Sequence, residues 1–212
     1  LVEGLHLEEP GGAVIGNMYY GFSQRALIPY EVEEAVAILY CEWVQRRHQG
    51  QGYSRLLFDA LTQRLSAEGT KGILAEASAG EEGLPYGHLL RRGFAPIQQA
   101  GPRRLMYYPL ARQAITAKPL ERRIEEQAQR PVRVLVFSGG FCPCETATSL
   151  VAADVAREFG GRVVLEQVPI SAESVRTYGV ARGVYINGRP VPEDGVPEEA
   201  MRHAIRQALE GS

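Results

Sequence analysis

The sequence has few cysteines, no long apolar run and little net charge, and each of these shortages narrows what the protein can be. It contains three cysteines, an odd number, and two of them stand together in one short motif, which suits a reducing cytoplasm better than a disulfide framework. No run of 18 apolar residues exists, so we expect no membrane span. The formal net charge of −2 gives no reason to expect nucleic acid or an anionic membrane as a partner.

What is present is the composition of an ordinary globular protein. Hydrophobic residues make up 45% and charged residues 23% of the chain, and its 212 residues suggest one large or two small domains. The first residues lack the basic and apolar regions of a signal peptide. The chain begins with Leu rather than an initiator Met, which leaves open that it is a piece of a longer protein.

The rest of the sequence is organised around residues 33–65. Residues 35–41 are all apolar or Tyr, which predicts a buried central strand. From Tyr53 onward, apolar residues recur at helical spacing as far as Leu65, which predicts an amphipathic helix. A basic turn with two glycines, RRHQGQG, connects the two elements.

This turn has the properties of an anion-binding site. Gly50 and Gly52 can adopt positive φ and allow a ligand to approach the backbone closely. The N–H groups of the following first helical turn would point at that ligand, and the helix dipole favours negative charge. Arg46 and Arg47 add positive charge, so a diphosphate is the expected ligand, although a tight connection without a ligand would need only one glycine. Arg55 stands where the third glycine of a dinucleotide fingerprint would be.

Arg47-x-x-Gly50-x-Gly52 resembles the acetyl-coenzyme A signature of the GNAT N-acetyltransferases, and residues 90–94 (LRRGF) resemble that family's Gly-Phe element. The resemblance implies an α/β fold with a GNAT-type mixed sheet and helices, although the family's N-terminal helices are absent from this sequence. It implies acetyl-CoA as co-substrate and a small-molecule or protein amine as acceptor. The cofactor-binding residues that it implies are Trp43, Val44, Arg47, Gln49, Gly50, Gln51, Gly52, Tyr53 and Ser54.

Acetyl transfer to an amine needs a polarised carbonyl, a proton acceptor and a proton donor. By strand alternation Glu42 shares a face with Val36 and Ile38, so we predict it as the general base. The alternative is a carboxylate that is solvated or paired with an Arg. In the family the carbonyl is polarised by a backbone N–H beside a strand bulge, here expected near Trp43 or Val44.

The proton donor is harder to assign. Many members of the family carry a Tyr four residues before the glycine of the Gly-Phe element, but here that position is Leu89. Tyr86 is therefore the candidate acid, and His88 lies near it in the sequence. The departure puts the chemistry in doubt but not the binding of the cofactor.

We expect the first domain to comprise residues 1–112 and the second residues 132–212. Strands are predicted at 2–8, 13–22, 72–77, 94–98 and 104–108, with a short helix at 84–91. Residues 113–131 are charged, and Leu120, Ile124 and Ala128 form a thin apolar stripe that predicts a linker helix.

The second domain is predicted to follow the order strand, helix, strand, helix, strand, strand, helix. With a cysteine motif at its first helix start, this order resembles a thioredoxin-like domain, and both halves together resemble acetyltransferases with a YoaP-like C-terminal domain. Cys142 and Cys144 flank Pro143 at the expected helix start, where a thiol has a lowered pKa. They are candidate redox residues, and no metal site is predicted from this pair alone, although a second chain or His203 could complete one.

Two functions remain open from the sequence. The first is an N-acetyltransferase with a thioredoxin-like accessory domain that selects or delivers a partner. The alternative is a thiol-redox or soft-metal-binding protein whose N-terminal domain binds coenzyme A without catalysis. A homodimer is left open in both.

Overall fold

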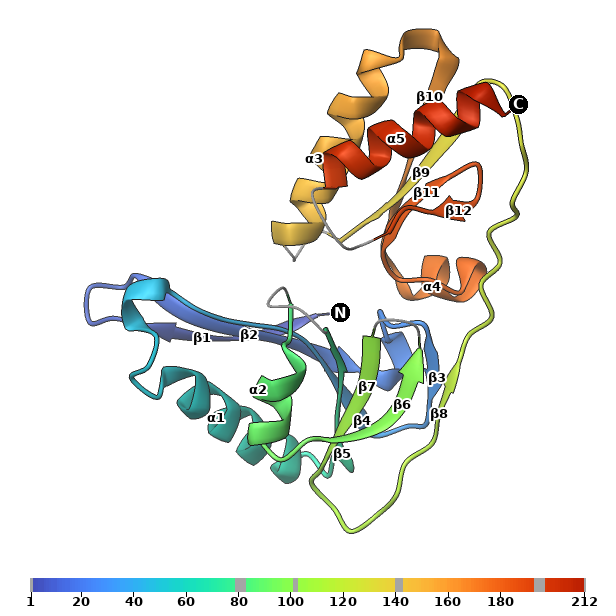
Figure 1. Cartoon of the computed structure of the whole chain (residues 1–212). Helices are drawn as coiled ribbons and strands as arrows, with labels where there is room; N and C mark the ends of the chain where they lie inside the picture. The colour runs from blue at the N-terminus through green and yellow to red at the C-terminus, as the bar shows by residue number, and fades with distance from the viewer. Residues whose placement is uncertain (1, 79–82, 101–102, 140–142, 193–196, 212) are drawn as a thin grey trace. The chain divides into compact units, whose positions relative to one another are not determined.

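The computed structural model describes residues 2–78, 83–100, 103–139, 143–192 and 197–211 (Figure 1). The chain divides into two compact units. Unit 1 comprises Leu1–Ala26 and Tyr30–Pro119, and unit 2 comprises Leu27–Pro29 and Leu120–Ser212. The division therefore falls later in the chain than the boundary expected from the sequence. Among the described helices, none has the length and apolar character needed to cross a membrane.

Unit 1 is built on a six-stranded mixed sheet with the strand order β1-β2-β4-β5-β7-β6. Only β4 and β5 run parallel; the other neighbours are antiparallel. A second small sheet pairs β3 with β8. The bounds of these strands are β1 Glu3–Glu8, β2 Val14–Phe22, β3 Tyr30–Val32, β4 Val36–Val44, β5 Gly72–Ala77, β6 Ala95–Ala100, β7 Arg103–Pro109 and β8 Ala117–Pro119.

Two α-helices, α1 (Tyr53–Ala67) and α2 (Tyr86–Arg91), cover one face of this sheet (Figure 1). Short 3-10 turns occupy Ser23–Arg25 and Arg46–His48. The apolar stripe of α1 is buried as its spacing predicts, with Leu61 and Leu65 fully inaccessible to solvent. The sheet and both helices thus share one core, and the predicted strands and helices of the first domain are present.

Over the stretch in which they pair, strand β4 has one residue more than its antiparallel partner β2. Tyr19 of β2 lies opposite Cys41, whereas the next residue, Tyr20, lies opposite Leu39. Tyr40 is therefore the extra residue of a β-bulge. A bulge bends its strand and increases the local twist, so the end of β4 takes a different direction from its beginning.

The parallel ladder between β4 and β5 ends at the bulge. It joins Val36–Leu39 to Gly72–Ala75, although both strands continue beyond these residues. The bulge at Tyr40 therefore lies earlier in the strand than the position near Trp43 or Val44 that we expected. A bulge in a central strand ends the pairing on one side while β2 continues to pair on the other.

The bulge also reverses the alternation expected for Glu42. Glu42 lies opposite Met18, whose side chain is fully buried in the core between the sheet and α1. Val44 belongs to the same core. Glu42 therefore faces α1, and the prediction that it shares a face with Val36 and Ile38 is wrong, because the extra residue shifts the two-residue period by one.

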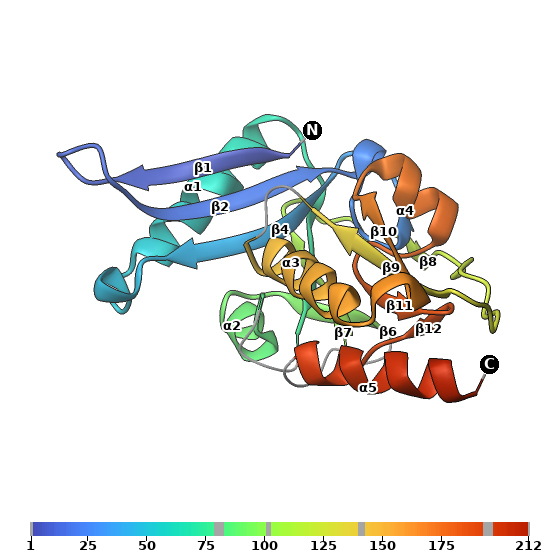
Figure 2. The same cartoon turned by 90° about the horizontal axis from the view of Figure 1, so that it is seen from above.

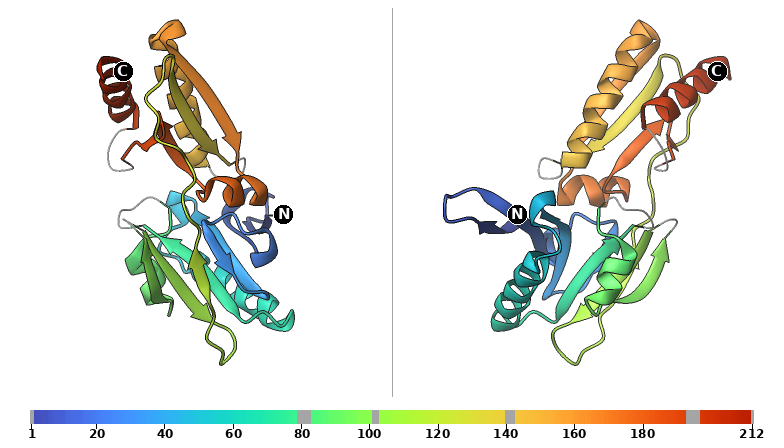
Figure 3. Two further views of the ribbon diagram at one scale, coloured as in Figure 1. Left: turned by 90° about the vertical axis from the view of Figure 1, so that its right-hand side faces the viewer. Right: turned by 60° about the vertical axis from the view of Figure 1, so that its left-hand side comes forward.

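Unit 2 has a four-stranded sheet with the order β10-β9-β11-β12, in which β9 and β10 are parallel and β11 is antiparallel to both of its neighbours (Figure 3). Helices α3 and α5 pack with Val134 and Val136 on one face, and the end of α4 packs with Phe137 on the other. The predicted element order is present. The bounds are β9 Val132–Ser138, α3 Pro143–Glu158, β10 Val163–Pro169, α4 Ala172–Tyr178, β11 Gly183–Ile186, β12 Arg189–Pro190 and α5 Pro197–Glu210, with a 3-10 turn at Gly160–Arg162.

The predicted linker helix at residues 113–131 is wrong. Apart from β8, this segment has no regular structure, and from Leu120 onward it belongs to unit 2. Its backbone is bonded to that unit instead of to itself: the N–H of Arg123 donates to the carbonyl of Tyr178 at 2.8 Å, and the N–H of Gln127 donates to Asn187 at 3.1 Å. We call residues 120–130 the strap.

The strap lies directly against two glycines of unit 2. A Cβ on Gly179 would stand 1.8 Å from the carbonyl oxygen of Glu121, and one on Gly188 would stand 2.0 Å from that of Glu125. Ile124 inserts between these contacts and is 7% exposed. The strap therefore needs glycine at both positions, and one buried side chain anchors it.

Candidate functional site

The glycine turn between β4 and α1 has the geometry that the sequence predicts. Gly50 and Gly52 have φ angles of 76° and 84°, in the left-handed region, and a Cβ on either would meet no atom within 4 Å. Gly52 is the N-cap of α1 and supplies no side-chain cap. The N–H groups of the first turn, from Tyr53 to Arg55, thus begin a 15-residue helix with open space beside the turn.

The basic side chains ahead of the glycines are held at the surface. Arg47 donates through Nε to the side chain of Gln45 at 3.0 Å and lies 3.7 Å from the Glu9 carboxylate. His48 Nε2 lies 2.9 Å from the same carboxylate. Because the Arg47 side chain is 64% exposed, its pairing with Glu9 is a weak surface interaction that a ligand can replace.

The end of β4 is fixed to the turn by one side chain. Gln49 Nε2 donates to the carbonyl of Val44 at 3.0 Å, and Gln51 Nε2 donates to that of Arg47 at 3.3 Å. The Val44 side chain is core, so only its backbone can take part in binding, whereas Trp43 is 46% exposed. These residues surround the turn as predicted, but Gln49 and Gln51 serve the turn itself.

Glu42 is the centre of a buried polar network. Its side chain is 6% exposed, and Oε1 accepts a hydrogen bond from Arg92 Nη2 at 2.6 Å and another from the hydroxyl of Ser54. Oε2 lies 3.3 Å from Nε2 of His88. Arg92 also donates to the Ser54 oxygen. The network joins β4, the first turn of α1 and the region of α2, and it matches the Arg-paired alternative for Glu42.

Arg92 is a buried cation in this network. Its side chain is 9% exposed and its guanidinium lies 4.7 Å from the centre of the Phe58 ring. Burial lowers the pKa of Arg92, while the carboxylate of Glu42 acts in the opposite direction. Nη1 is buried and has no hydrogen-bond partner among the described residues.

His88 and Arg92 were not among the predicted site residues. They lie four residues apart and therefore on one side of α2 and its last turn, which is the signal that could have indicated them. The His88 side chain is 32% exposed, the most accessible charged or titratable member of the network. No periodicity shows, however, that this side of α2 faces Glu42.

The candidate acid Tyr86 begins α2, outside the network. The Arg104 guanidinium lies 4.2 Å from the centre of its ring, and the ring packs against the core of unit 1. Leu89, at the position of the family's tyrosine, is fully buried in that core. The structure therefore gives Tyr86 a packing role and leaves its catalytic role as a prediction.

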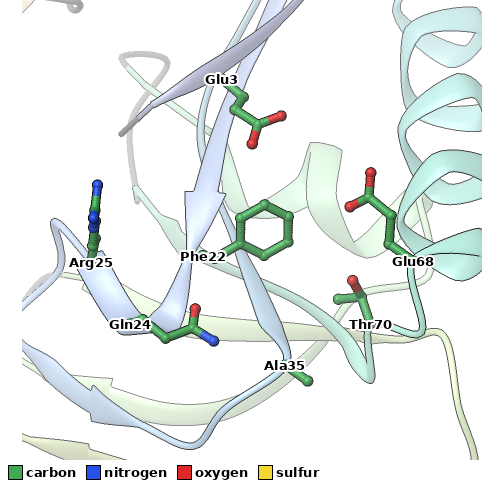
Figure 4. A pocket seen from close by; sticks show the side chains of 7 residues that line it. All are labelled: Glu3, Phe22, Gln24, Arg25, Ala35, Glu68 and Thr70. Atoms are coloured by element: carbon green, nitrogen blue, oxygen red, sulfur yellow. The ribbon is translucent and has the colours of Figure 1, made fainter.

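A cavity of about 480 Å³ lies at the other end of α1 (Figure 4). Glu3 and Glu68 both line it together with Phe22, and both carboxylates are bound by Arg64, at 2.7 and 3.0 Å. None of the predicted site residues lines this cavity. A 15-residue helix separates it from the glycine turn, so we do not assign it to the same site.

The cysteine motif is outside the part of the chain that can be described. Cys142 and the side chain of Cys144 are not among the described residues, so their predicted redox role stays a prediction. Cys41 is a half-buried residue of β4. His203 is exposed on α5.

No protein-family model matches the sequence, and no curated protein matches it. Solved structures resemble about half of the chain. A GNAT-family protein from Desulfovibrio desulfuricans has a TM-score of 0.43 and 19% identity, covering 52% of this chain and 70% of that one. The ribosomal-protein-S18-alanine N-acetyltransferase from Escherichia coli has a TM-score of 0.41 and 16% identity, covering 53% and 71%. PaiA N-acetyltransferase from Thermoplasma acidophilum, in complex with coenzyme A, has a TM-score of 0.42 and 10% identity, covering 51% and 60%.

Proposed function

We propose that unit 1 binds acetyl-CoA beside the glycine turn and transfers its acetyl group to an amine. One observation carries this proposal: the β4–β5 ladder ends at a bulge, and β4 then leads directly into a helix opened by two glycines at positive φ. A ligand with an anionic end and an extended, amide-bearing arm fits this combination. The diphosphate would accept from the first-turn N–H groups of α1, and the arm would lie along β4.

The predicted cofactor residues have separate roles in this proposal. Gly50 and Gly52 let the diphosphate approach, and the backbone of Tyr53 and Ser54 donates to it. Arg47 turns from Glu9 to the phosphates at small cost, because the exposed pair is worth no more than about 1 kcal/mol. Gln49 and Gln51 hold the turn, while Trp43 and the backbone of Val44 face the arm.

For the chemistry we propose that the polar network centred on Glu42 removes the proton of the amine. A backbone N–H of β4 beyond the bulge polarises the thioester carbonyl. Tyr86 stays the candidate for protonating the departing thiolate. The acceptor is a small molecule or a protein with a free amine. We place the reaction in the cytoplasm, with no nucleic acid or membrane as partner, and leave a homodimer open.

For unit 2 we propose a thioredoxin-like, YoaP-like accessory domain. The sheet order β10-β9-β11-β12 with helices on both faces supports this, and a role in selecting or delivering the partner follows from the proposed transfer. The second candidate function is a thiol-redox or soft-metal protein whose unit 1 binds coenzyme A without catalysis. The observation that favours it is Leu89, a core residue where the family has its acid.

The binding proposal is tested by Gly52→Ala with Gly69→Ala as the matched control. Both glycines have left-handed φ angles, 84° and 74°, and open space around them, at opposite ends of α1. Each substitution costs roughly 1 kcal/mol of backbone strain, but only the Cβ at Gly52 stands where the diphosphate would lie. Calorimetric titration should show at least about tenfold weaker coenzyme A binding for Gly52→Ala, a loss of about 1.4 kcal/mol, and unchanged binding for Gly69→Ala.

Equal affinity in the two variants would count against the glycine turn as the site. Catalysis is measured separately, as release of free thiol from acetyl-CoA in the presence of a panel of amines. Binding of coenzyme A without thiol release would favour the second candidate function. A wild-type protein that binds neither form would rule out both.

A further inference from the structure

We infer that His88, through Nδ1, is the group that takes the proton from the amine, with Glu42 as the positioning residue behind it. This inference rests on the proposed acetyl transfer and assigns one of its steps to an atom. The Glu42 carboxylate limits which group can take the proton. The Glu42 side chain is 6% exposed and already accepts hydrogen bonds from Arg92 and Ser54, so its Oε1 is occupied.

The ion pair with Arg92 argues against Glu42 as the group that takes the proton. A guanidinium at 2.6 Å stabilises the charged carboxylate, and accepting a proton would leave that buried cation without its counter-ion. Because Arg92 is 9% exposed, water could not replace the lost counter-ion. Glu42 therefore stays charged and can only accept hydrogen bonds.

That constraint fixes the tautomer of His88. Oε2 of a charged Glu42 has no hydrogen to donate, so the hydrogen between it and Nε2, 3.3 Å away, belongs to the histidine. Neutral His88 then carries its lone pair on Nδ1. The side chain is 32% exposed, against 6% for Glu42 and 9% for Arg92, so His88 is the titratable member of the network that an amine can reach.

The proposed step is the transfer of the acetyl group from the thioester to the amine. An ammonium group gives one proton to Nδ1 of His88, and the free amine attacks the thioester carbonyl carbon. The N–C bond forms, the C–S bond breaks with its electron pair passing to sulfur, and the nitrogen gives up a second proton. One of the two protons ends on the thiol of coenzyme A and the other in solvent. Glu42 stabilises the imidazolium while it lasts.

Among the described residues, the charged groups of the network that holds His88 are Glu42 from β4 and Arg92 at the end of α2. On α1, Arg55 and Asp59 act on Arg92 from further away. A neutral His88 is required for proton acceptance, so the rate of transfer should fall as the pH is lowered and this histidine becomes protonated.

The test compares pH profiles of kcat/KM for the wild type, His88→Ala and Glu42→Gln, with His6→Gln, an exposed histidine of β1, as the control. His88→Ala should lose about 10²–10⁴-fold in rate and lose the acid limb of the profile. Added imidazole should restore part of its rate. Coenzyme A binding should be unchanged, because the described side-chain partner of His88 is Glu42 and not the glycine turn. His6→Gln should behave as the wild type.

A second readout does not depend on activity. Nitrogen NMR of labelled protein should show an unprotonated Nδ1 and a protonated Nε2 for neutral His88, and Glu42→Gln should disturb this tautomer. Transfer that His88→Ala retains with the acid limb intact would overturn the inference and leave the proposed function standing. A wild-type protein that binds acetyl-CoA but never transfers would overturn the proposed function, and the inference with it.

Discussion

Glu42 and Arg92 form a buried ion pair in unit 1. Removing one partner of such a pair costs roughly 3–5 kcal/mol, because it leaves the other charge buried, whereas the intact pair gains little over an apolar pair of the same volume. Stability alone is therefore a weak reason for the pair. Its effect on geometry is stronger, because it holds Ser54 and His88 at fixed positions.

Tyr20 shows how burial acts on one titratable group. Its side chain is fully buried and its hydroxyl donates to Glu3 at 2.9 Å. Burial, and then the Glu3 carboxylate, raise the pKa of Tyr20 above its ordinary value. The folded state thus keeps this proton at a pH where the unfolded chain loses it, so the stabilisation is complete below pH of about 10 and is lost as the pH rises further.

We predict that Tyr20→Phe lowers the free energy of unfolding by about 1 kcal/mol near neutral pH, because it removes one hydrogen bond. Above pH of about 10 the gap between the variant and the wild type should narrow, since only the wild type has this proton to lose. Urea unfolding at a series of pH values measures both effects. The neighbouring half-buried Tyr19 gives the control variant, Tyr19→Phe, and two parallel stability curves for Tyr20→Phe and wild type would contradict the prediction.

At the scale of elements, the core of unit 1 does not depend on the bulge of β4, whereas the proposed binding site does. Deleting Tyr40 would leave a regular strand in which Glu42 and Val44 still face α1, because the extra residue is the one removed. The core pattern would survive, but the bend that ends the β4–β5 ladder would not.

We therefore predict that the Tyr40 deletion folds, as seen by circular dichroism and a cooperative melt, but binds coenzyme A at least about tenfold more weakly, a loss of about 1.4 kcal/mol. Tyr40→Thr keeps the residue count and should bind as the wild type does. An affinity that survives the deletion would show that the bulge is irrelevant to the ligand. Unfolding of the deletion variant alone would show that the bulge serves the fold.

The same element shows what a sequence can and cannot predict. The strand at residues 35–41 and the helix from Tyr53 follow from hydrophobic patterning, and the glycine turn between them follows from its residue types. The bulge does not, because every residue from 35 to 41 is apolar or Tyr and no break marks the extra one. The face of Glu42 was predicted wrongly for that reason alone.

In the candidate site too, the residues that are close in sequence could be predicted, and those brought together by the fold could not. The predicted cofactor residues are local to one turn, so their spacing was enough to bring them together. His88 and Arg92 reach Glu42 across 46 and 50 residues of sequence, and only the docking of α2 on the sheet brings them there. The strap failed as a predicted helix because unit 2 offers its backbone better partners than the thin apolar stripe could.

At the scale of the whole molecule, we expect trypsin to cut after Arg112 before it cuts after Arg122 or Arg123. Residues 111–114 are all exposed, whereas the strap is bonded to unit 2 on both sides of buried Ile124. Mass spectrometry of timed digests should first show the pieces 1–112 and 113–212. A first cut inside the strap would mean that its bonds to unit 2 open readily.

The strap is synthesised before most of the residues that it binds. It leaves the ribosome ahead of β9, yet the carbonyls that will hold it, on Tyr178 and Asn187, are translated more than fifty residues later. Until then, of its described backbone bonds to unit 2, it can form the one from the Leu120 N–H to the carbonyl of Pro29, at 2.9 Å. Its sequence, LERRIEEQAQR, disfavours aggregation during this delay. Its charged residues keep it hydrated, and its large apolar residues are Leu120 and Ile124 alone. The composition that resembled a loose linker is thus also what a late-docking segment needs during translation.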